Sequence, residues 1–257
     1  ADGVSRMSVL AMRFLGVGNA ATLRLGSSCA VLLRDRSPLL LIDIGPDALQ
    51  RFEAAFGMLP RAVFITHAHL DHIADFEPWF YRLVFADAPL PRLYVPAPLV
   101  PILQRRIADF PNWVAEGGRN FWDVFQLIPV SESFWHGELK FDVFAVRHHA
   151  PDAAFGIALP GSFVYSGDTR PIPDQLLAYP TETVFHDVSV RGNPSHTGLD
   201  ELQRYPDTVR ARLWLYHYGD SDEAALSGER LVRAGVDIAL AEPVTLATSD
   251  GQRAWTE

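Results

Sequence analysis

The segment 67–72, with the sequence HAHLDH, constrains the fold of this chain more than any other feature. It follows a short apolar run with strand character, so we expect the motif on the turn that leaves a strand end. There, His67 and His69 can face one metal ion while Asp71 and His72 face a second. Imidazole nitrogens and carboxylate oxygens are ligands that Zn²⁺ and similar divalent ions take up. A polar loop rich in histidine is the alternative, and the density of donors favours a metal site.

Strand-like runs alternate with amphipathic helical runs along the chain. Strands are expected at 12–17, 29–34, 39–44, 62–66, 92–95, 125–130, 140–147, 155–159, 163–165, 183–186, 212–216 and 237–241. Helices are expected at 46–57, 77–85, 99–110, 198–204 and 220–234, the last with Asp220 and Glu223 at capping-box spacing. Each half places strands before helices. This order predicts two sheets packed face to face with helices outside, a four-layer αββα sandwich.

The organisation of the chain predicts a single domain. No linker rich in Pro, Gly or Ser divides residues 1–257, and residues 1–6 are expected to be a short arm or an added remnant. The stretch 111–120 is predicted to be a loop, either an ordinary connection or a lid or subunit-contact segment. Because 111–125 is rich in aromatic residues and apolar for a free loop, it also favours a homodimer.

The composition excludes several classes of protein. Hydrophobic residues make up 48% of the 257 residues, enough for a full core. The net charge of -9 and the pI of about 5.4 argue against a protein that binds nucleic acid mainly through a basic surface. The single cysteine, Cys29, excludes an intramolecular disulfide and is expected to be buried rather than a thiolate ligand. No apolar run reaches the length of about 18 residues that a membrane span needs, so a cytoplasmic location is expected.

Further donors follow later strands. His148, His149, Asp168 and His217 each come directly after a predicted strand. Strand ends are the usual position of sites in layered α/β folds. Taken singly, Asp168 could be a turn residue and His217 a buried structural histidine. Together, in this order after the first motif, they predict the rest of a two-metal site.

This order of motifs resembles the metallo-β-lactamase superfamily, in which a carboxylate bridges two metal ions. Within the superfamily it is most similar to the tRNase Z-like branch of phosphodiesterases, and the resemblance covers nearly the whole chain. The segments that carry it are 12–18 (MRFLGVG), 41–45 (LIDIG), 166–171 (SGDTRP), 186–187 (HD, where the branch has a His-Glu pair), 195–197 (SHT) and 215–218 (LYHY).

The resemblance implies a set of metal ligands. They are His67, His69 and His148 on the first metal, Asp71, His72 and His217 on the second, and Asp168 between the two. His148 is preferred because its spacing to Pro151 is similar to that of the family, while two extra residues in the loop keep His149 open. Two divalent ions are therefore expected, with Zn²⁺ as the first choice and Mn²⁺ or Fe²⁺ as alternatives.

The resemblance also implies the chemistry. Two metals about 3.5–4 Å apart can hold a hydroxide and a phosphoryl or carbonyl oxygen, and Asp71 can orient that hydroxide. His196, held by Asp187, is the candidate general acid for the leaving alkoxide. The alternative is that His196 only precedes the helix predicted at 198–204. His186 and His136 are expected to be structural.

We therefore expect a two-metal hydrolase, a phosphodiesterase that uses metal-bound hydroxide on a small nucleotide, cyclic or linear, or on an RNA end. A carbonyl hydrolase (lactonase, thioesterase or β-lactamase-like) and a non-catalytic metal-binding regulatory protein are the alternatives. The pair at 186–187 and His196 favour phosphodiester chemistry. tRNA is not an expected partner, because no Gly/Pro-rich arm lies between Val95 and Phe141 and the branch's Ser-x-Arg-Tyr ending does not follow His217. The resemblance also implies a homodimer.

Overall fold

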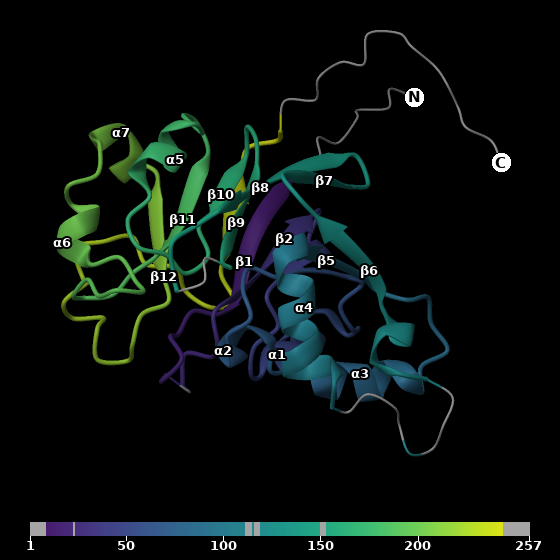
Figure 1. Cartoon of the computed structure of the whole chain (residues 1–257). Coiled ribbons are helices and arrows are strands. Elements are labelled where there is room, and N and C mark those ends of the chain that lie inside the picture. The colour runs from purple at the N-terminus through teal and green to yellow at the C-terminus, as the bar shows by residue number, and fades with distance from the viewer. Residues whose placement is uncertain (1–8, 23, 111–114, 116–118, 150–152, 244–257) are drawn as a thin grey trace, which may run out of the picture.

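The strands of the chain form two sheets that lie against one another (Figure 1). The computed structural model describes residues 9–22, 24–110, 115, 119–149 and 153–243. The seven-stranded sheet has the order β13-β1-β2-β3-β4-β5-β6 and the six-stranded sheet the order β12-β11-β10-β9-β8-β7. In the first sheet the bounds are β1 Leu10–Gly16, β2 Cys29–Arg34, β3 Ser37–Ile42, β4 Ala62–Phe64, β5 Arg92–Pro96, β6 Gln126–Val130 and β13 Asp237–Leu240. In the second they are β7 Ser133–His136, β8 Leu139–Ala145, β9 Phe155–Leu159, β10 Phe163–Tyr165, β11 Thr183–Asp187 and β12 Leu213–Tyr216.

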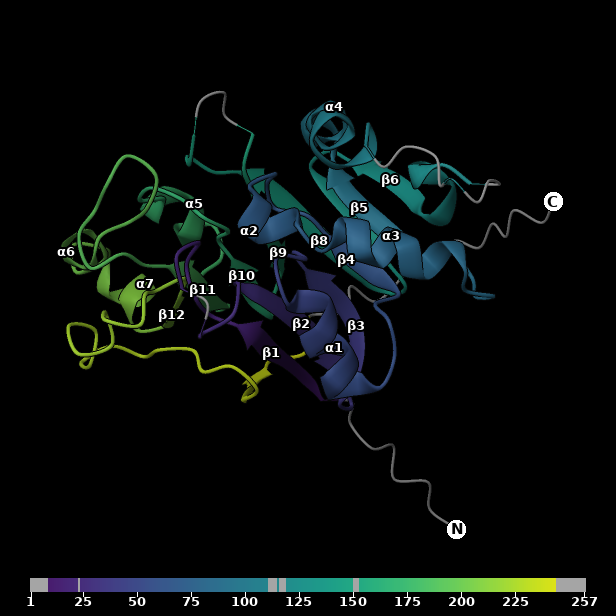
Figure 2. The same cartoon turned by 90° about the horizontal axis from the view of Figure 1, so that it is seen from below.

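Short helices connect the strands and cover the sheets. They are α1 Ala48–Phe56, α2 Leu70–Ile73, α3 Phe76–Val84, α4 Val100–Leu103, α5 Pro173–Leu177, α6 Leu199–Leu202 and α7 Asp207–Arg210. Two 3-10 turns, Ala97–Leu99 and Phe121–Val124, and a π-helical turn, Gln104–Ala108, complete the set. Figure 2 shows α1 and α3 beside the seven-stranded sheet and α5 to α7 beside β10 to β12.

The layers follow from the alternation of side chains along each strand. In β2, Ala30 and Leu32 point into the core between the two sheets, whereas Val31 and Leu33 point to the opposite face. On that outer face they share a second core with Phe52 of α1 and its neighbouring helices. Both faces of β2 are covered, which fits the unbroken apolar run from Cys29 to Leu33. The predicted αββα sandwich is confirmed, and it places the strand ends of both sheets along one edge.

Every strand expected from the sequence is present, with ends within two residues of those predicted. β7 was not predicted, because its four residues are too short for a clear alternation. It forms a hairpin with β8, in which Phe134 stacks on Phe141 at 5.1 Å between ring centroids. Cys29 is fully buried as predicted, and burial raises the pKa of its thiol to about 12.

The helix predicted at 220–234 is wrong. The described residues there make turns, and the segment then returns to the edge of β12. The N–H of Leu215 donates to the carbonyl of Arg230, and the N–H of Val232 donates to the carbonyl of Leu215. This pairing satisfies backbone groups on an otherwise open strand edge. Gly228 also disfavours a helix by ~1 kcal/mol relative to alanine, so the local capping pattern did not decide the structure.

The aromatic stretch at 111–125 does not supply a free apolar surface where it is described. Residues 111–114 and 116–118, on which the loop prediction partly rests, lie outside the described residues. Phe121 and Phe125 are buried and pack against Phe76 of α3 within the same chain. The argument for a homodimer from this stretch therefore does not hold for its described aromatic side chains. None of the helices in the described part of the chain has the length and apolar character needed to cross a membrane.

Candidate active site

Donor side chains from four separate segments meet where the ends of the two sheets come together. One segment follows β4 and continues into α2, and the other three each follow a strand of the six-stranded sheet. The donors form two groups, in each of which the ligand atoms lie within 4.8 Å of one another: His67, His69 and His148 in the first, and Asp71, His72, Asp168 and His217 in the second. A third set that meets the same distance criterion, Asp168, Asp187, His196 and His217, shares two members with the second group. The structure thus brings together all the residues that the sequence predicted as ligands.

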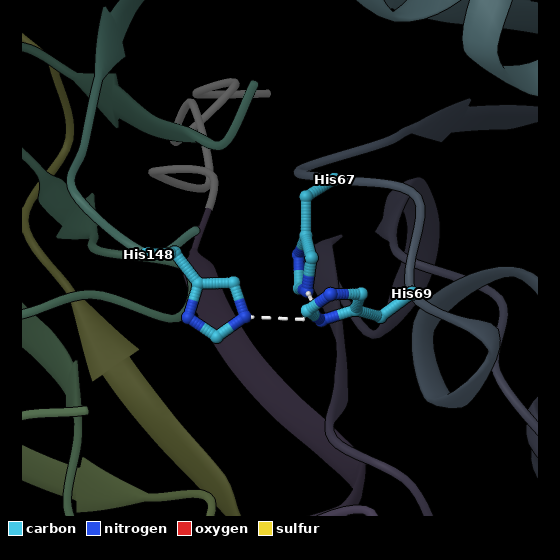
Figure 3. Close-up of side chains that lie close together, drawn as sticks. All are labelled: His67, His69 and His148. Atoms are coloured by element: carbon cyan, nitrogen blue, oxygen red, sulfur yellow. Dashed lines mark hydrogen bonds between the residues drawn. The ribbon is translucent and has the colours of Figure 1, made fainter. Parts of the chain in front are cut away.

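The first group consists of three imidazole rings that face one another (Figure 3). His67 Nε2 lies 3.1 Å from His69 Nδ1, and His148 Nε2 lies 3.0 Å from the same atom. The far nitrogen of His148, Nδ1, donates to the carbonyl of Ser195 at 2.8 Å, so its Nε2 carries a lone pair in the neutral ring. His69 Nδ1 carries at most one hydrogen for these two contacts, so the three nitrogens cannot all be paired well, and a cation between them would accept their lone pairs.

The first-group histidines are held in the neutral form that metal ligands require. Burial lowers the pKa of His67 well below its ordinary value, and the neighbouring His72 adds to the effect. Burial, with help from the other imidazoles, lowers the pKa of His69 to about 4. The pKa of His148 is lowered as well, chiefly by burial. Neutral imidazoles can bind a divalent ion without first losing a proton.

The second group combines two imidazoles with two carboxylates. His72 Nε2 and His217 Nε2 each lie 3.2 Å from Asp168 Oδ2, and His72 Nε2 lies 3.4 Å from Asp71 Oδ2. Both Nε2 atoms and Asp168 Oδ1 are buried, and within the described residues none of the three has a hydrogen-bond partner. Buried polar atoms without partners are costly and need an explanation. A divalent cation with mixed nitrogen and oxygen ligands fits this donor set.

Asp168 belongs to the second group and also lies close to the first. Its Oδ2 lies 3.8 Å from His67 Nε2 and from His148 Nε2, in addition to the two shorter distances in the second group. Burial alone would raise the pKa of this carboxyl, but the surrounding histidines lower it well below its ordinary value. The carboxylate therefore stays charged between the groups, which is what a bridging ligand requires.

A buried carboxylate behind the site orients two of the histidines, and the sequence reasoning did not assign it a role. Asp43 Oδ2 accepts hydrogen bonds from His72 Nδ1 and from the Thr66 hydroxyl, both at 2.7 Å. Because that hydroxyl gives its proton to Asp43, it accepts from His67 Nδ1 at 3.0 Å. Both rings are thus fixed with Nε2 toward the donor groups. Asp43 has a positive φ of 64°, and its position directly after an apolar strand was the available signal.

A histidine and a carboxylate stand beside the donor groups. His196 Nδ1 donates to Asp187 Oδ2 at 2.9 Å, and the backbone N–H of Thr169 donates to the same oxygen at 3.2 Å. The His196 ring lies 4.9 Å from the ring of His148 and 4.7 Å from that of His217. Burial lowers the pKa of His196, but the hydrogen bond to Asp187 and nearby carboxylates outweigh burial and raise it. The pair can hold a proton beside the site.

His149 and His186 lie outside the two donor groups. The ring of His149 lies 4.9 Å from His69 and 6.2 Å from His67, and His149 belongs to neither donor group. His186 Nε2 lies 3.1 Å from the Tyr205 hydroxyl and is buried away from both groups. The geometry therefore favours His148 over His149 as a donor.

Residues 10–233 match the protein family described as Anti-Pycsar protein Apyc1. The chain belongs to this family. A relative of that name from Paenibacillus harenae is 28% identical over 229 residues, which cover 82% of this chain and 90% of the relative. Another, from Bacillus phage BSP38, is 27% identical over 242 residues, covering 82% and 90%.

Solved structures confirm the fold of this Apyc1-family chain. The metallo-β-lactamase fold protein YhfI from Bacillus subtilis matches with a TM-score of 0.69 and 15% identity over 90% of this chain and 99% of YhfI. A diphosphatase of the PhnP family matches with a TM-score of 0.71 and 18% identity over 91% and 99%. The short form of human tRNase Z matches with a TM-score of 0.59 and 16% identity over 89% and 98%. The predicted metallo-β-lactamase fold is thus confirmed.

Proposed function

We propose that this chain is a two-metal phosphodiesterase that hydrolyses a small cyclic nucleotide. The observation that carries the proposal is the pair of His196 and Asp187 beside two buried donor groups, since this arrangement joins metal ligands to a proton donor. The family's name, anti-Pycsar, is consistent with a cyclic nucleotide as the substrate.

The proposed ligands are the members of the two donor groups. The first ion would be held by His67, His69 and His148, the second by Asp71, His72 and His217, and both by Asp168. Zn²⁺ is the proposed metal, with Mn²⁺ and Fe²⁺ as alternatives, because the set mixes nitrogen and oxygen. Two divalent ions bound there would lower the pKa of a water molecule and stabilise charge on a phosphoryl oxygen.

The protein side chains then move protons and hold the reactants. Asp71 is partly exposed, with 19% of its side chain accessible, so its carboxylate can accept a hydrogen bond from the attacking water and orient it. The water oxygen forms a bond to phosphorus and releases one proton to the solvent, while an ester P–O bond breaks. His196 gives its proton to the departing ester oxygen, and Asp187 stabilises and orients the imidazole through Nδ1. Hydrolysis of a cyclic ester opens the ring and yields a nucleoside monophosphate.

Metal analysis and a turnover panel test the proposal. The panel contains a bis-aryl phosphate, 2′,3′- and 3′,5′-cyclic nucleotides, a pre-tRNA, a lactone and a chromogenic cephalosporin. We expect two metal ions per chain and turnover of the aryl diester and a cyclic nucleotide. Preferred turnover of the lactone or cephalosporin would establish a carbonyl hydrolase instead, and cleavage of the pre-tRNA alone would establish an RNA-end enzyme. A homodimer, which the resemblance implies, and a cytoplasmic location remain proposals.

A further inference from the structure

A cavity of about 240 Å³ adjoins the donor groups on the side of His196. His196 and His217 are among the residues that line it, and the rest of the lining comes from the loops that follow β1, β11 and β12. Pockets for drug-sized ligands span roughly 300–1,000 Å³. The volume here therefore suits one sugar or nucleoside rather than a stretch of nucleic acid.

The chemistry of the cavity is that of a neutral, hydroxyl-bearing group. No lysine or arginine is among the described residues that line it, so no cation is there to hold a second phosphate. Asp222 is the one carboxylate of the lining, and it would repel a phosphate. Among the described residues that line the cavity only the two histidines carry a ring, so no Trp, Tyr or Phe face is offered to a nucleobase.

A hydrogen-bond donor and an acceptor lie together in one corner of this cavity. Asp222 Oδ2 accepts from the N–H of Gly219 at 2.7 Å, while Oδ1 accepts no hydrogen bond from the described residues. Asn19 Oδ1 accepts from the N–H of Ala21 at 3.1 Å, which fixes the amide and leaves Nδ2 without an acceptor among the described residues. A Cβ at Gly219 would lie 2.9 Å from Asp222 Oδ2 and 3.4 Å from Asn19 Nδ2, so the two polar groups flank this glycine.

The corner is held rigidly relative to His217. The N–H of His217 donates to the carbonyl of Val17 at 2.8 Å, and the N–H of Asn19 donates to the carbonyl of Tyr218 at 3.3 Å. These bonds join the loop after β1 to the loop after β12. His217 has a φ of 67°, a left-handed conformation that a histidine keeps only when its surroundings enforce it. The donor and acceptor of the corner are therefore positioned by the same backbone that positions a proposed ligand.

We infer that this cavity binds the ribose of the substrate and that Asp222, together with Asn19, recognises its 2′-hydroxyl. The inference rests on the proposed function. In a cyclic nucleotide the ester oxygen that His196 protonates is itself a ribose oxygen, so the sugar must lie against His196 and hence in this cavity. A 3′,5′-cyclic nucleotide has one free ribose hydroxyl, at the 2′ position. That hydroxyl can donate to Asp222 and accept from Asn19 Nδ2.

The test compares a 3′,5′-cyclic ribonucleotide with its 2′-deoxy counterpart of the same base. The wild-type enzyme should prefer the ribonucleotide in kcat/KM by roughly 10-fold or more, the effect of losing a hydrogen bond to a charged group. Asp222→Asn replaces the free acceptor by a donor, while the oxygen of the new amide can still accept from the N–H of Gly219. The variant should bring the ratio for the two substrates close to one, with metal content unchanged.

Glu223→Gln is the matched control. Glu223 is the next residue of the same loop, pairs with Arg233 at 2.5 Å and does not line the cavity. The change in charge is the same, and the ribose preference should stay at the wild-type value. A bis-aryl phosphate, which has no sugar, is measured in parallel to report the catalytic state of each preparation.

Three outcomes would overturn the inference. A wild-type enzyme that hydrolyses both cyclic nucleotides equally well would leave the proposed function intact and remove the ribose contact. Equal losses on both substrates in Asp222→Asn would mean that the carboxylate acts on another part of the molecule. Turnover of the aryl diester with no turnover of any cyclic nucleotide would overturn the proposed function itself, and the inference with it.

Discussion

The two halves of the donor set are built in different ways. In the N-terminal half, His67, His69, Asp71 and His72 come from one turn after β4, and the Asp43 carboxylate holds two of the rings from behind. These donors are close in space because they are close in sequence. The precision of this half depends on side-chain hydrogen bonds that fix the direction of each imidazole.

In the C-terminal half, His148, Asp168 and His217 come from the ends of three different strands. The backbone provides the support seen here: the carbonyl of Ser195 holds His148, and a left-handed φ and a bond to the carbonyl of Val17 hold His217. The relative positions of these three donors therefore depend on how strands β8 to β12 pair. The contrast teaches that the first half can be weakened by one side-chain change behind the site, whereas the second depends on the donors themselves and on sheet register.

The largest effect is expected at Asp168, the donor of the second group that also lies close to the first. Asp168→Ala removes the carboxylate that lies near four imidazole nitrogens, so the variant should lose both ions or hold them at sub-stoichiometric levels, and activity with them. Elemental analysis of the purified variant measures the metal content, and circular dichroism checks the fold. Two tightly bound ions per folded chain of the variant would contradict the bridging role of Asp168.

The next largest effect is expected at His196, the proposed proton donor. His196→Ala should slow hydrolysis of a cyclic nucleotide or alkyl diester by roughly 10²–10⁴-fold, because a poor leaving group cannot depart without a proton. An activated aryl ester should be affected much less, since a phenolate leaves unaided, and the metal content should be that of the wild type. Asp187→Asn should give a weaker version of this selectivity by misorienting the ring. Equal losses on both classes of substrate would point to a role in binding or support.

A smaller effect is expected from the carboxylate behind the N-terminal half. Asp43→Asn keeps the shape of the side chain but weakens the bonds that orient His72 and, through Thr66, His67. Loss of such outer partners typically lowers metal affinity by roughly 10–100-fold. Competition with a chelator measures the affinity. Asp142→Asn on β8, outside both donor groups, is the control with the same change in charge and should match the wild type.

The smallest effect is expected at His149, and His148 beside it is the comparison. His149→Ala should leave both ions in place, because His149 belongs to neither donor group. His148→Ala should lose the first ion, since it removes a nitrogen that lies 3.0 Å from His69 Nδ1. Elemental analysis of the two variants, prepared side by side, makes the measurement. Loss of an ion in His149→Ala with retention in His148→Ala would reverse the assignment.

Much of the fold and most of the donor set could be predicted from the sequence. The motif at 67–72 is visible because its members are neighbours in the chain, and strand alternation predicted every strand except the short β7. Asp168 and His217 were predicted because each directly follows a strand, and family resemblance supplied the order. A pattern of period two or a ligand motif survives in the sequence because local geometry produces it.

Other features were decided only by the tertiary structure. The choice between His148 and His149 depends on which ring faces His69 across the junction of the sheets. The role of Asp43 depends on which atoms are buried around its carboxylate. The segment 220–234 has a helical pattern but pairs with the edge of β12, because a strand edge offers backbone partners that the local sequence cannot reveal. The corner formed by Asn19 and Asp222 joins loops that are far apart in the chain. Tertiary packing sets the distances between residues that are far apart in the chain, and a local sequence pattern does not contain them.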